Sequence, residues 1–395
     1  MTEPPANAPL LLGSLLRALN EAPPFELTST LHRYLAGSIG ALSCTVLVAD
    51  YEERSLEPLP GPSQSSTLGA QDVDGSPAGR AYRDQAVVEV ALGDGDIVMF
   101  LPITLRAERV GVLEVRLAGA DPTVRDQLAE AAHVLAYVVM AARRYTDEFE
   151  RVRRRRDLKL AAELQWELLP VLAYCCAEYD IAGSLEPAYE IGGDTFDYAV
   201  SPTDLTVALS DAMGHGLRSA LLGSLAVTTM RNVRRRGGGV VEQATEAAVH
   251  LIEQFTGEFF VTAVLLAIDV PSGAAAVVNA GQQLPILVRA GRASPVNLSA
   301  APPLGMFPDT LYVPERITLE PGDRLVLVSD GILDANPVGG QPFGEARLYE
   351  LLREVAGVSA SETVRLITSA VTKHRAGKLQ DDATAVCLDW RGTAS

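Results

Sequence analysis

The chain has 395 residues, 48% hydrophobic and 21% charged, a composition typical of globular domains and not of a disordered tail. Its formal net charge of −17 argues against non-specific binding to nucleic acid or to anionic membranes, because their phosphates would be repelled. The sequence lacks a signal-peptide pattern, an apolar run long enough to cross a bilayer, and the cysteine spacing of a zinc site or disulfide framework, so we expect a cytoplasmic protein.

The N-terminal third predicts a mixed α/β unit. A helix is expected near 26–40, a strand at 44–51, a polar loop at 58–79, two β-rich runs around a turn at 106–109, and an apolar-periodic helix at 121–143. This order of elements resembles a GAF sensory domain, which we assign to residues 1–142. No cysteine, histidine or metal pattern identifies its ligand, which is an unknown small-molecule or protein input.

The next segment, 143–171, predicts a helical linker. It has no glycine, it ends at Pro170, and it carries an apolar stripe at helical spacing from Leu158 to Leu169 that includes Gln165. Its basic run, 151–156, alternates with acidic residues and favours a solvated helix face over a nucleic-acid site. The stripe can pack against its own domain or against a second copy in a coiled coil, and the second arrangement predicts a homodimer.

Residues 172–395 alternate strand and helix signals within one long domain. Strands are expected in "DLTVALSDA", on both sides of "PSG" at 271–273, in "LPILVRAGRASPVNL", in "DRLVLVSDG" and in "ATAVCLDW". Helices are expected at 217–235, at 241–256, and as a pair within 345–375. The fold class is therefore mixed α/β (α+β).

Acidic residues at strand ends carry the candidate chemistry. They are Asp194 in "GGDTFD", Asp211 in "LSDAMGHG", Asp330 in "LVSDG", and Asp381 with Asp382 in "QDDAT". One such Asp is most simply a turn residue. Several carboxylates can converge only if cations neutralise them, and Mg²⁺ or Mn²⁺ prefers oxygen ligands of this kind. We therefore predict a divalent metal site.

The same residues lie in an ordered series of motifs. The series is "LAAELQWELLP", "GGDTFDY", "SDAMGHGLRSAL", "FVTAVLLAID", "NAGQQLP", "PPLGM", "PGDRLVLVSDGILDA", "FGEARL" and "DDATAVCLDW", which together span 158–390. It resembles the bacterial stage-II-sporulation and stress-response type of PP2C-like (PPM) serine/threonine phosphatase. The resemblance implies an αββα sandwich over 172–395, with two Mn²⁺ or Mg²⁺ ions in a cleft at one edge.

The resemblance also implies the roles of individual residues. Asp194 and Asp211 match the catalytic carboxylates that bridge the two metals, the carbonyl of Ala212 matches the backbone ligand, and Asp330 and Asp381 match the carboxylates that complete the second metal. Residues matching neighbouring or substrate-contacting positions are Gly193, Asp197, Gly214, His215, Gly331 and Asp382.

Three positions depart from known patterns. Met213 stands where eukaryotic members carry a candidate general acid, so water or another group must protonate the leaving group. Gln282 stands where relatives often carry His. "GGDTF" is similar to the GGDEF signature of diguanylate cyclases, but those enzymes need an acidic residue where Thr195 stands.

The expected activity is metal-dependent hydrolysis of phosphoserine or phosphothreonine on a protein. By analogy, the expected substrate is a phosphorylated STAS-type anti-anti-sigma factor in a partner-switching pathway, with regulation by the N-terminal sensor. The alternative is a weakly active or inactive phosphatase fold that acts as a binding scaffold.

Overall fold

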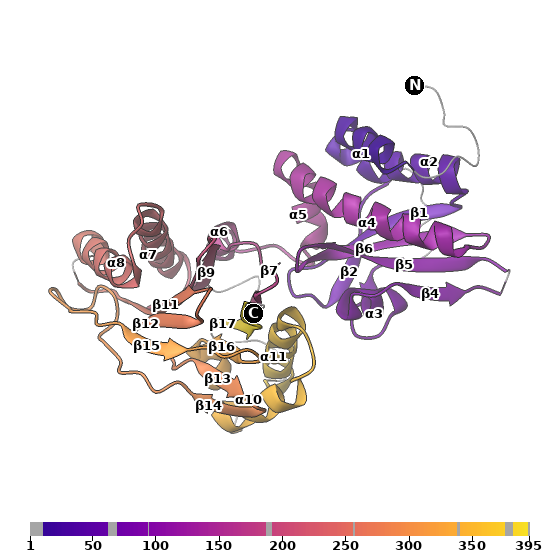
Figure 1. Cartoon of the computed structure of the whole chain (residues 1–395). Helices are drawn as coiled ribbons and strands as arrows, with labels where there is room; N and C mark the ends of the chain where they lie inside the picture. Colours follow the sequence, from indigo (N-terminus) through magenta and orange to yellow (C-terminus); the bar gives the residue numbers. More distant parts are fainter. Residues whose placement is uncertain are drawn as a thin grey trace. The chain divides into compact units, whose positions relative to one another are not determined.

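The computed structural model describes residues 11–61, 69–93, 95–186, 192–255, 257–337, 340–375 and 382–393. The chain forms two compact units, residues 1–157 and residues 158–395 (Figure 1). None of the helices in these described ranges has the length and apolar content that crossing a bilayer requires.

An antiparallel sheet lies at the centre of the N-terminal unit. In the described ranges its strand order is β3-β2-β1-β6-β5-β4. The strands are β1 (Ser43–Ala49), β2 (Ser55–Pro58), β3 (Gln71–Asp72), β4 (Val88–Ala91), β5 (Ile97–Leu105) and β6 (Glu108–Leu117). The predicted hairpin around 106–109 is confirmed: β5 and β6 pair directly across a tight turn in which Arg106 has a φ of 57°.

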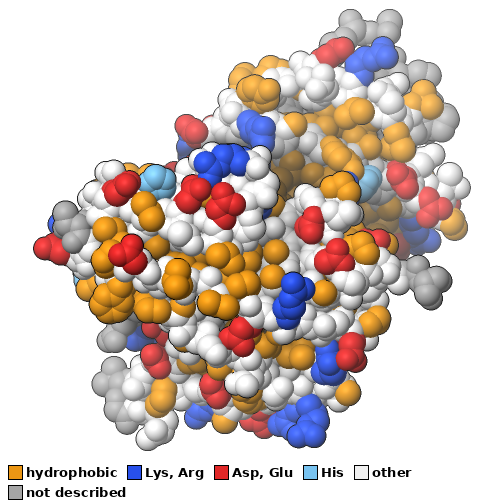
Figure 2. Space-filling view, turned by 60° about the vertical axis from the view of Figure 1, so that its left-hand side comes forward, with side chains coloured by type: hydrophobic (Ala, Val, Ile, Leu, Met, Phe, Trp, Pro, Cys, Tyr) orange, Lys and Arg blue, Asp and Glu red, His pale blue; other side chains and the backbone are white. Residues whose placement is uncertain are grey.

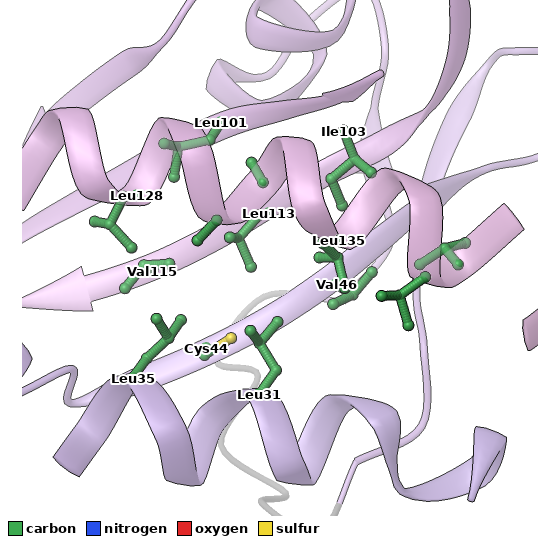
Figure 3. Close-up of a cluster of buried hydrophobic side chains, with 14 of the residues drawn as sticks. Leu31, Leu35, Cys44, Val46, Leu101, Ile103, Leu113, Val115, Leu128 and Leu135 are labelled. Carbon is green, nitrogen blue, oxygen red and sulfur yellow. The ribbon is translucent and has the colours of Figure 1, made fainter. Parts of the chain in front are cut away.

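Helices cover both faces of this sheet. They are α1 (Leu12–Glu21), α2 (Leu27–Ile39), α3 (Pro77–Asp84), α4 (Pro122–Ala142) and α5 (Glu148–Arg153). Figure 3 shows the larger core, in which side chains of α2 and α4 meet those of β1, β5 and β6. The smaller core lies on the opposite face, under α3. The predicted helix at 121–143 is confirmed, and it begins where Asp121 accepts a hydrogen bond from the Val124 amide.

The linker differs from the single helix that the sequence predicts. It contains the short helix α5, non-helical backbone at 154–159, and α6 (Leu160–Leu168). Arginines of the exit segment bind back to their own unit: Arg153 donates to the Ala49 carbonyl at 3.1 Å and its guanidinium stacks on the Tyr51 ring, and Arg156 pairs with Glu52 at 3.1 Å. These contacts tie Arg153 and Arg156 to β1 and the residues after it, and α5 ends at Arg153.

The C-terminal unit contains two antiparallel sheets. In the described ranges, one has the order β15-β12-β11-β10-β9 and the other the order β14-β13-β16-β17-β8-β7. The strands are β7 (Ala173–Cys175), β8 (Tyr179–Glu186), β9 (Asp194–Val200), β10 (Asp204–Ala212), β11 (Val261–Asp269), β12 (Ala274–Ala280), β13 (Ile286–Arg289), β14 (Arg292–Pro295), β15 (Glu315–Thr318), β16 (Arg324–Val328) and β17 (Ala383–Trp390).

The two sheets pack face to face between helices (Figure 1). The core between them joins apolar side chains of both sheets, and Phe196 of β9 lies so close to Gly183 of β8 that a Cβ there would be 2.3 Å from its ring. The helices are α7 (Leu217–Arg235), α8 (Val240–Phe255), α9 (Asp330–Leu333), α10 (Gly344–Glu354) and α11 (Ala360–His374). Helices α7 and α8 cover the first sheet, and α10 and α11 pack against the second. The unit is thus the expected αββα sandwich.

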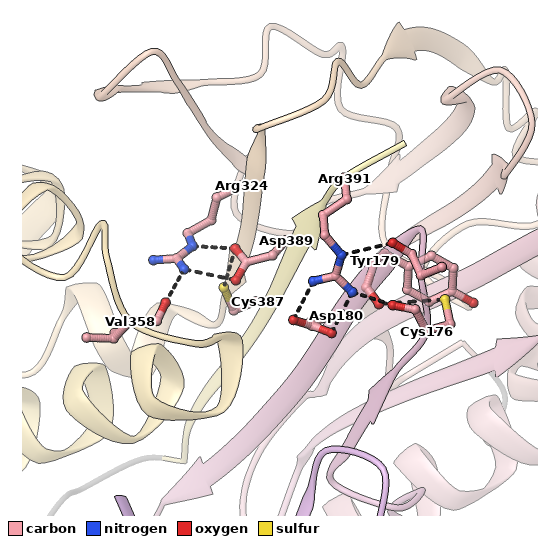
Figure 4. Close-up of polar contacts among 9 residues, drawn as sticks. Cys176, Tyr179, Asp180, Arg324, Val358, Cys387, Asp389 and Arg391 are labelled. Atoms are coloured by element: carbon pink, nitrogen blue, oxygen red, sulfur yellow. Dashed lines mark hydrogen bonds and ion pairs between the residues drawn. The ribbon is translucent and has the colours of Figure 1, made fainter. Parts of the chain in front are cut away.

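Two arginines fasten β16 and β17 to their surroundings (Figure 4). Arg324 forms a two-point ion pair with Asp389 and also donates to the Val358 carbonyl at 2.7 Å, beyond the end of α10. Arg391 forms a second two-point pair with Asp180 of β8, with one N–O distance of 2.7 Å. Bidentate pairs of this kind fix geometry, so the strand that follows Asp382 is held in register with β8 and β16.

Candidate metal and active site

Two carboxylates stand directly opposite each other at the end of the β9–β10 pair. Asp194 is the first residue of β9, and its partner in the antiparallel register is Asp211, next to the last residue of β10. Residues that face each other across a strand pair project to the same side of the sheet, here the side that faces the second sheet. Like charges in this arrangement repel, so the pair is unfavourable unless a proton or a cation compensates one of the charges.

The environment of Asp194 strengthens that argument. Its side chain is 2% exposed, and its Oδ2 has no hydrogen-bond partner among the described residues. Burial, followed by the charges of Asp211 and Asp382, raises the pKa of Asp194 well above its ordinary value, while the nearby hydroxyls of Ser329 and Thr384 oppose the shift. A buried oxygen without a donor, held beside two other carboxylates, has the chemistry of a ligand for a hard cation.

The backbone around this pair is packed too closely for a side chain at position 193. A Cβ on Gly193 would lie 2.6 Å from Ser219 Oγ, 3.0 Å from the Ala212 carbonyl oxygen and 3.6 Å from Asp211 Oδ1. The Ala212 amide donates to the Gly193 carbonyl at 3.1 Å, and Ser219 Oγ donates to the Ala212 carbonyl at 2.7 Å. Because a carbonyl oxygen has two lone pairs, the Ala212 oxygen retains one for a further partner.

Asp382 reaches the same place from the other sheet. Its Oδ2 accepts a hydrogen bond from the Asp194 amide at 3.2 Å and another from Gln165 Nε2 at 2.9 Å. The Gln165 amide also donates to the Asp194 carbonyl oxygen. Gln165 lies on α6, is 2% exposed, and thereby connects β9 to the segment that precedes β17. In the sequence, Gln165 is a polar residue within an apolar stripe. That polarity was the one feature of the sequence that could have indicated its role in the site.

The motif around Asp330 is fastened to the same segment. Ser329 precedes α9, its amide donates to the Thr384 carbonyl at 2.9 Å, and its Oγ accepts from the Thr384 amide at 3.0 Å. A Cβ on Gly331 would be 1.9 Å from the Asp382 carbonyl oxygen, so only glycine fits. Asp330 is half-buried at the first position of α9. Its backbone therefore lies beside that of Asp382.

Asp381 lies outside the described residues. Within the described ranges, no three His, Cys, Asp or Glu side chains are grouped closely enough to hold a metal ion. The structure thus joins Asp194, Asp211 and Asp382 through strand register, hydrogen bonding and charge, and brings Asp330 to the same segment of chain. The oxygen donors fit a divalent cation in type, since carboxylates and a backbone carbonyl are what Mg²⁺ and Mn²⁺ prefer.

Asp197 belongs to a different network. It is three residues from Asp194 in β9, so its side chain projects from the opposite face. There Arg231 donates to its Oδ1 from both Nε and Nη2, at 3.1 and 2.8 Å, and Arg234 donates to its Oδ2 at 2.8 Å. The same Nη2 of Arg231 reaches the Leu168 carbonyl at the end of α6. Asp197 therefore ties β9 to α7, and its charge is neutralised without a metal.

The loop between β10 and α7 is open to solvent. Gly214 has a φ of 92° and Gly216 a φ of 77°, values that glycine adopts without strain. His215 is exposed between them. Met213 is also exposed, while its amide donates to the Phe260 carbonyl at 3.0 Å and so fixes the start of the loop.

Gln282 is buried just beyond the end of β12. Its backbone amide donates to Asn279 Oδ1 at 2.8 Å, and its backbone carbonyl accepts from Asn279 Nδ2 at 3.0 Å. Its side-chain Oε1 accepts from the Gln283 backbone amide. Its Nε2 is a buried donor with no partner in the described part of the chain. The Asn279 side chain therefore fixes the turn, and Gln282 Nε2 is available to donate a hydrogen bond.

The αββα sandwich places the C-terminal unit in the PP2C-like fold class. The SiaA-PP2C domain of Pseudomonas aeruginosa has this fold, with a TM-score of 0.50 and 20% identity, covering 59% of this chain and 94% of that one. Residues 201–391 match the family model Stage II sporulation protein E (SpoIIE). The C-terminal unit is therefore similar in sequence to SpoIIE and similar in fold to PP2C-type phosphatase domains.

Two curated proteins are also similar to this chain over part of its length. Protein IcfG of Synechocystis sp. is 24% identical over 265 residues, covering 59% of this chain. Phosphoserine phosphatase RsbP of Bacillus subtilis is 24% identical over 243 residues, covering 60% of this chain. The matches span 41% and 58% of the relatives' own lengths. The likeness to a GAF domain in the N-terminal unit stays a prediction.

Proposed function

We propose that the C-terminal unit is a divalent-metal-dependent protein phosphatase that hydrolyses phosphoserine or phosphothreonine. The observation that carries this proposal is the cross-strand pair of Asp194 and Asp211, with the buried oxygen of Asp194 lacking a hydrogen-bond donor among the described residues. A carboxylate pair of this kind is unfavourable in a fold that has no cation to place there. The family match over 201–391 supports the reaction class.

Each residue has a part in the proposed site. Asp194 and Asp211, with the Ala212 carbonyl, would hold two Mn²⁺ or Mg²⁺ ions, and Asp330 and Asp381 would complete the ligands of the second ion. Two such ions, when bound, supply a strong nucleophile from water and offset charge on the phosphoryl oxygens. The bond from phosphorus to the serine oxygen breaks as a bond to the water oxygen forms. Because Met213 offers no proton, the leaving serine oxygen takes one from water or from another group.

The substrate class follows from the relatives by analogy. RsbP is described as a phosphoserine phosphatase, and we infer that the substrate here is a phosphorylated STAS-type anti-anti-sigma factor in a partner-switching pathway. The N-terminal unit would act as the sensor that regulates turnover. A homodimer joined through the linker is part of the same proposal, with the exposed Leu160 of α6 as its apolar contact.

A phosphate-release assay tests the proposal. Purified protein is incubated with a serine-phosphorylated STAS-domain protein in Mn²⁺, in Mg²⁺ and in a chelator. We expect release that depends on the cation and stops with the chelator. Binding of the phosphoprotein without release in either cation would instead support the alternative, a phosphatase fold that works as a signalling scaffold.

Gln165 is expected to position the site without touching substrate. Changing Gln165→Leu keeps the apolar packing of α6 but removes the amide that donates to Asp194 and Asp382. We expect the Mn²⁺ concentration for half-maximal activity to rise about tenfold, the effect of losing about one charge-assisted hydrogen bond. Steady-state rates measured across a Mn²⁺ titration give this value.

Gln243→Leu is the matched control for that change. Gln243 is equally buried, on α8, and donates to the Gly238 carbonyl at 3.3 Å. Its loss should lower stability by about 1 kcal/mol and leave the Mn²⁺ requirement unchanged. If both variants shift the Mn²⁺ requirement alike, Gln165 has only a packing role.

A further inference from the structure

Exposed apolar side chains surround the loop that follows Ala212. Four of them have between 36% (Met306) and 53% (Phe307) of their surface exposed, and a half-buried phenylalanine lies among them. Figure 2 shows apolar side chains gathered in a band on the face turned toward the viewer. The five residues, here called the apolar rim, are Met213, Leu217, Phe259, Met306 and Phe307.

Three separate segments are joined in the apolar rim. The Met213 amide donates to the Phe260 carbonyl at 3.0 Å, which places the start of the loop against the residue before β11. Val261 and Leu304 exchange two backbone hydrogen bonds of 2.9 and 2.8 Å, so the turn that carries Met306 runs beside the first residue of β11. These backbone contacts place the three segments that carry the rim side by side.

The turn that presents Met306 and Phe307 is held firmly. Gly305 has a φ of 84°, and a Cβ there would lie 2.7 Å from the Leu251 Cβ on α8, so only glycine lets the turn pack so closely. Thr310 Oγ1 donates to the Phe307 carbonyl at 2.9 Å, closing the next turn. An ordered turn that exposes apolar side chains loses little conformational entropy when a partner binds. Such turns are typical of a binding surface.

The rim also carries a positive charge. The guanidinium of Arg218 lies over the Phe259 ring, 4.9 Å from its centroid. No ion pair joins Arg218 to an acidic side chain in the described ranges. In a chain with a net charge of −17, a cation on this surface complements a phosphorylated partner.

We propose that the apolar rim is the docking surface for the protein that carries the phosphoserine. The inference rests on the proposed function and names the chemistry of the substrate: a folded phosphoprotein with apolar side chains around its phosphoserine. Met213 directly follows Asp211 and Ala212 in the chain, so the rim begins next to the proposed site. A folded partner whose phosphoserine reaches Asp211 must therefore lie over the rim. Methionine and phenylalanine are side chains that interfaces favour at such places.

The test compares two substrates in one variant. Met306→Ala combined with Phe307→Ala is assayed with Mn²⁺ on a serine-phosphorylated STAS-domain protein and on p-nitrophenyl phosphate, which brings no folded partner to the rim. We expect the ratio of the two kcat/KM values, protein over small substrate, to fall about tenfold or more, through KM of the protein. Val200→Ala is the control, because Val200 is 41% exposed at the far end of β9.

A binding measurement keeps the rim and the proposed function separable. Calorimetry on Asp211→Asn, with and without the rim substitutions, reports docking of the same phosphoprotein without turnover. Weaker binding in the rim variant supports docking at the rim. This holds even if the protein without substitutions releases no phosphate, because the absence of release contradicts only the proposed function. The inference is overturned if the rim substitutions change neither the ratio of kcat/KM values nor the affinity for the phosphoprotein. If those two values stay unchanged while light scattering shows that a dimer has become a monomer, the inference is also overturned, because the rim then joins two copies of the chain.

Discussion

Asp211→Asn is expected to reduce phosphoserine hydrolysis by on the order of 10³-fold, because the change removes a charged ligand from the place where transition-state charge is offset. The same change should leave the metal-free protein as stable as before, or more stable. Asp211 faces Asp194 directly across the strand pair, and removing one of two opposed carboxylates relieves their repulsion. Initial rates in Mn²⁺ and a calorimetric unfolding scan in chelator measure the two effects.

Asp197→Asn is the matched control for Asp211→Asn. Asp197 is a buried Asp on the adjacent strand, but it binds Arg231 and Arg234 on the opposite face. Its loss should lower stability by about 1–3 kcal/mol and leave most of the activity. The two variants thus predict opposite outcomes. Full activity in Asp211→Asn would show that this carboxylate holds no catalytic metal.

Local patterns predicted most of the C-terminal unit correctly. The helix expected at 217–235 has those bounds, and the strand expected in "DLTVALSDA" is β10. Both depend on short-range rules: apolar spacing, a Gly at each end of the helix, and alternation along the strand. Strand ends also predicted that Asp194 and Asp211 lie close together, and β9 and β10 place both at the same edge of the sheet.

What the sequence could not supply is which polar groups meet across long separations. Gln165 contacts Asp382 across 217 positions, and nothing near either residue predicts that hydrogen bond. Alternation along the strand predicts that Asp197 and Asp194 lie on opposite faces. It does not predict that arginines of α7 bind Asp197. The linker was predicted as one helix because helical periodicity says nothing about Arg153 and Tyr51 binding each other 102 positions apart (153 − 51).

Mn²⁺ should stabilise the C-terminal unit strongly. At a concentration 100 times its dissociation constant, a ligand that binds only the folded state adds about 2.7 kcal/mol to the free energy of unfolding. For a unit of this size that corresponds to a rise of roughly 5–10 °C in its unfolding temperature. The gain is expected here because the cation would neutralise Asp194 and Asp211, whose mutual repulsion the metal-free fold must tolerate. Differential scanning calorimetry with Mn²⁺ and with chelator measures it.

The origin of that shift can be assigned by substitution. Asp194→Asn should abolish it, because the change removes the buried carboxylate oxygen that lacks a hydrogen-bond donor in the described ranges. Asp197→Asn should retain it, since its arginine partners already neutralise that position. NaCl at matched ionic strength should give no comparable rise, because screening acts weakly on buried charges. An equal shift in Asp194→Asn would mean that Mn²⁺ binds elsewhere, and the strand-end carboxylates would then need another explanation for their burial.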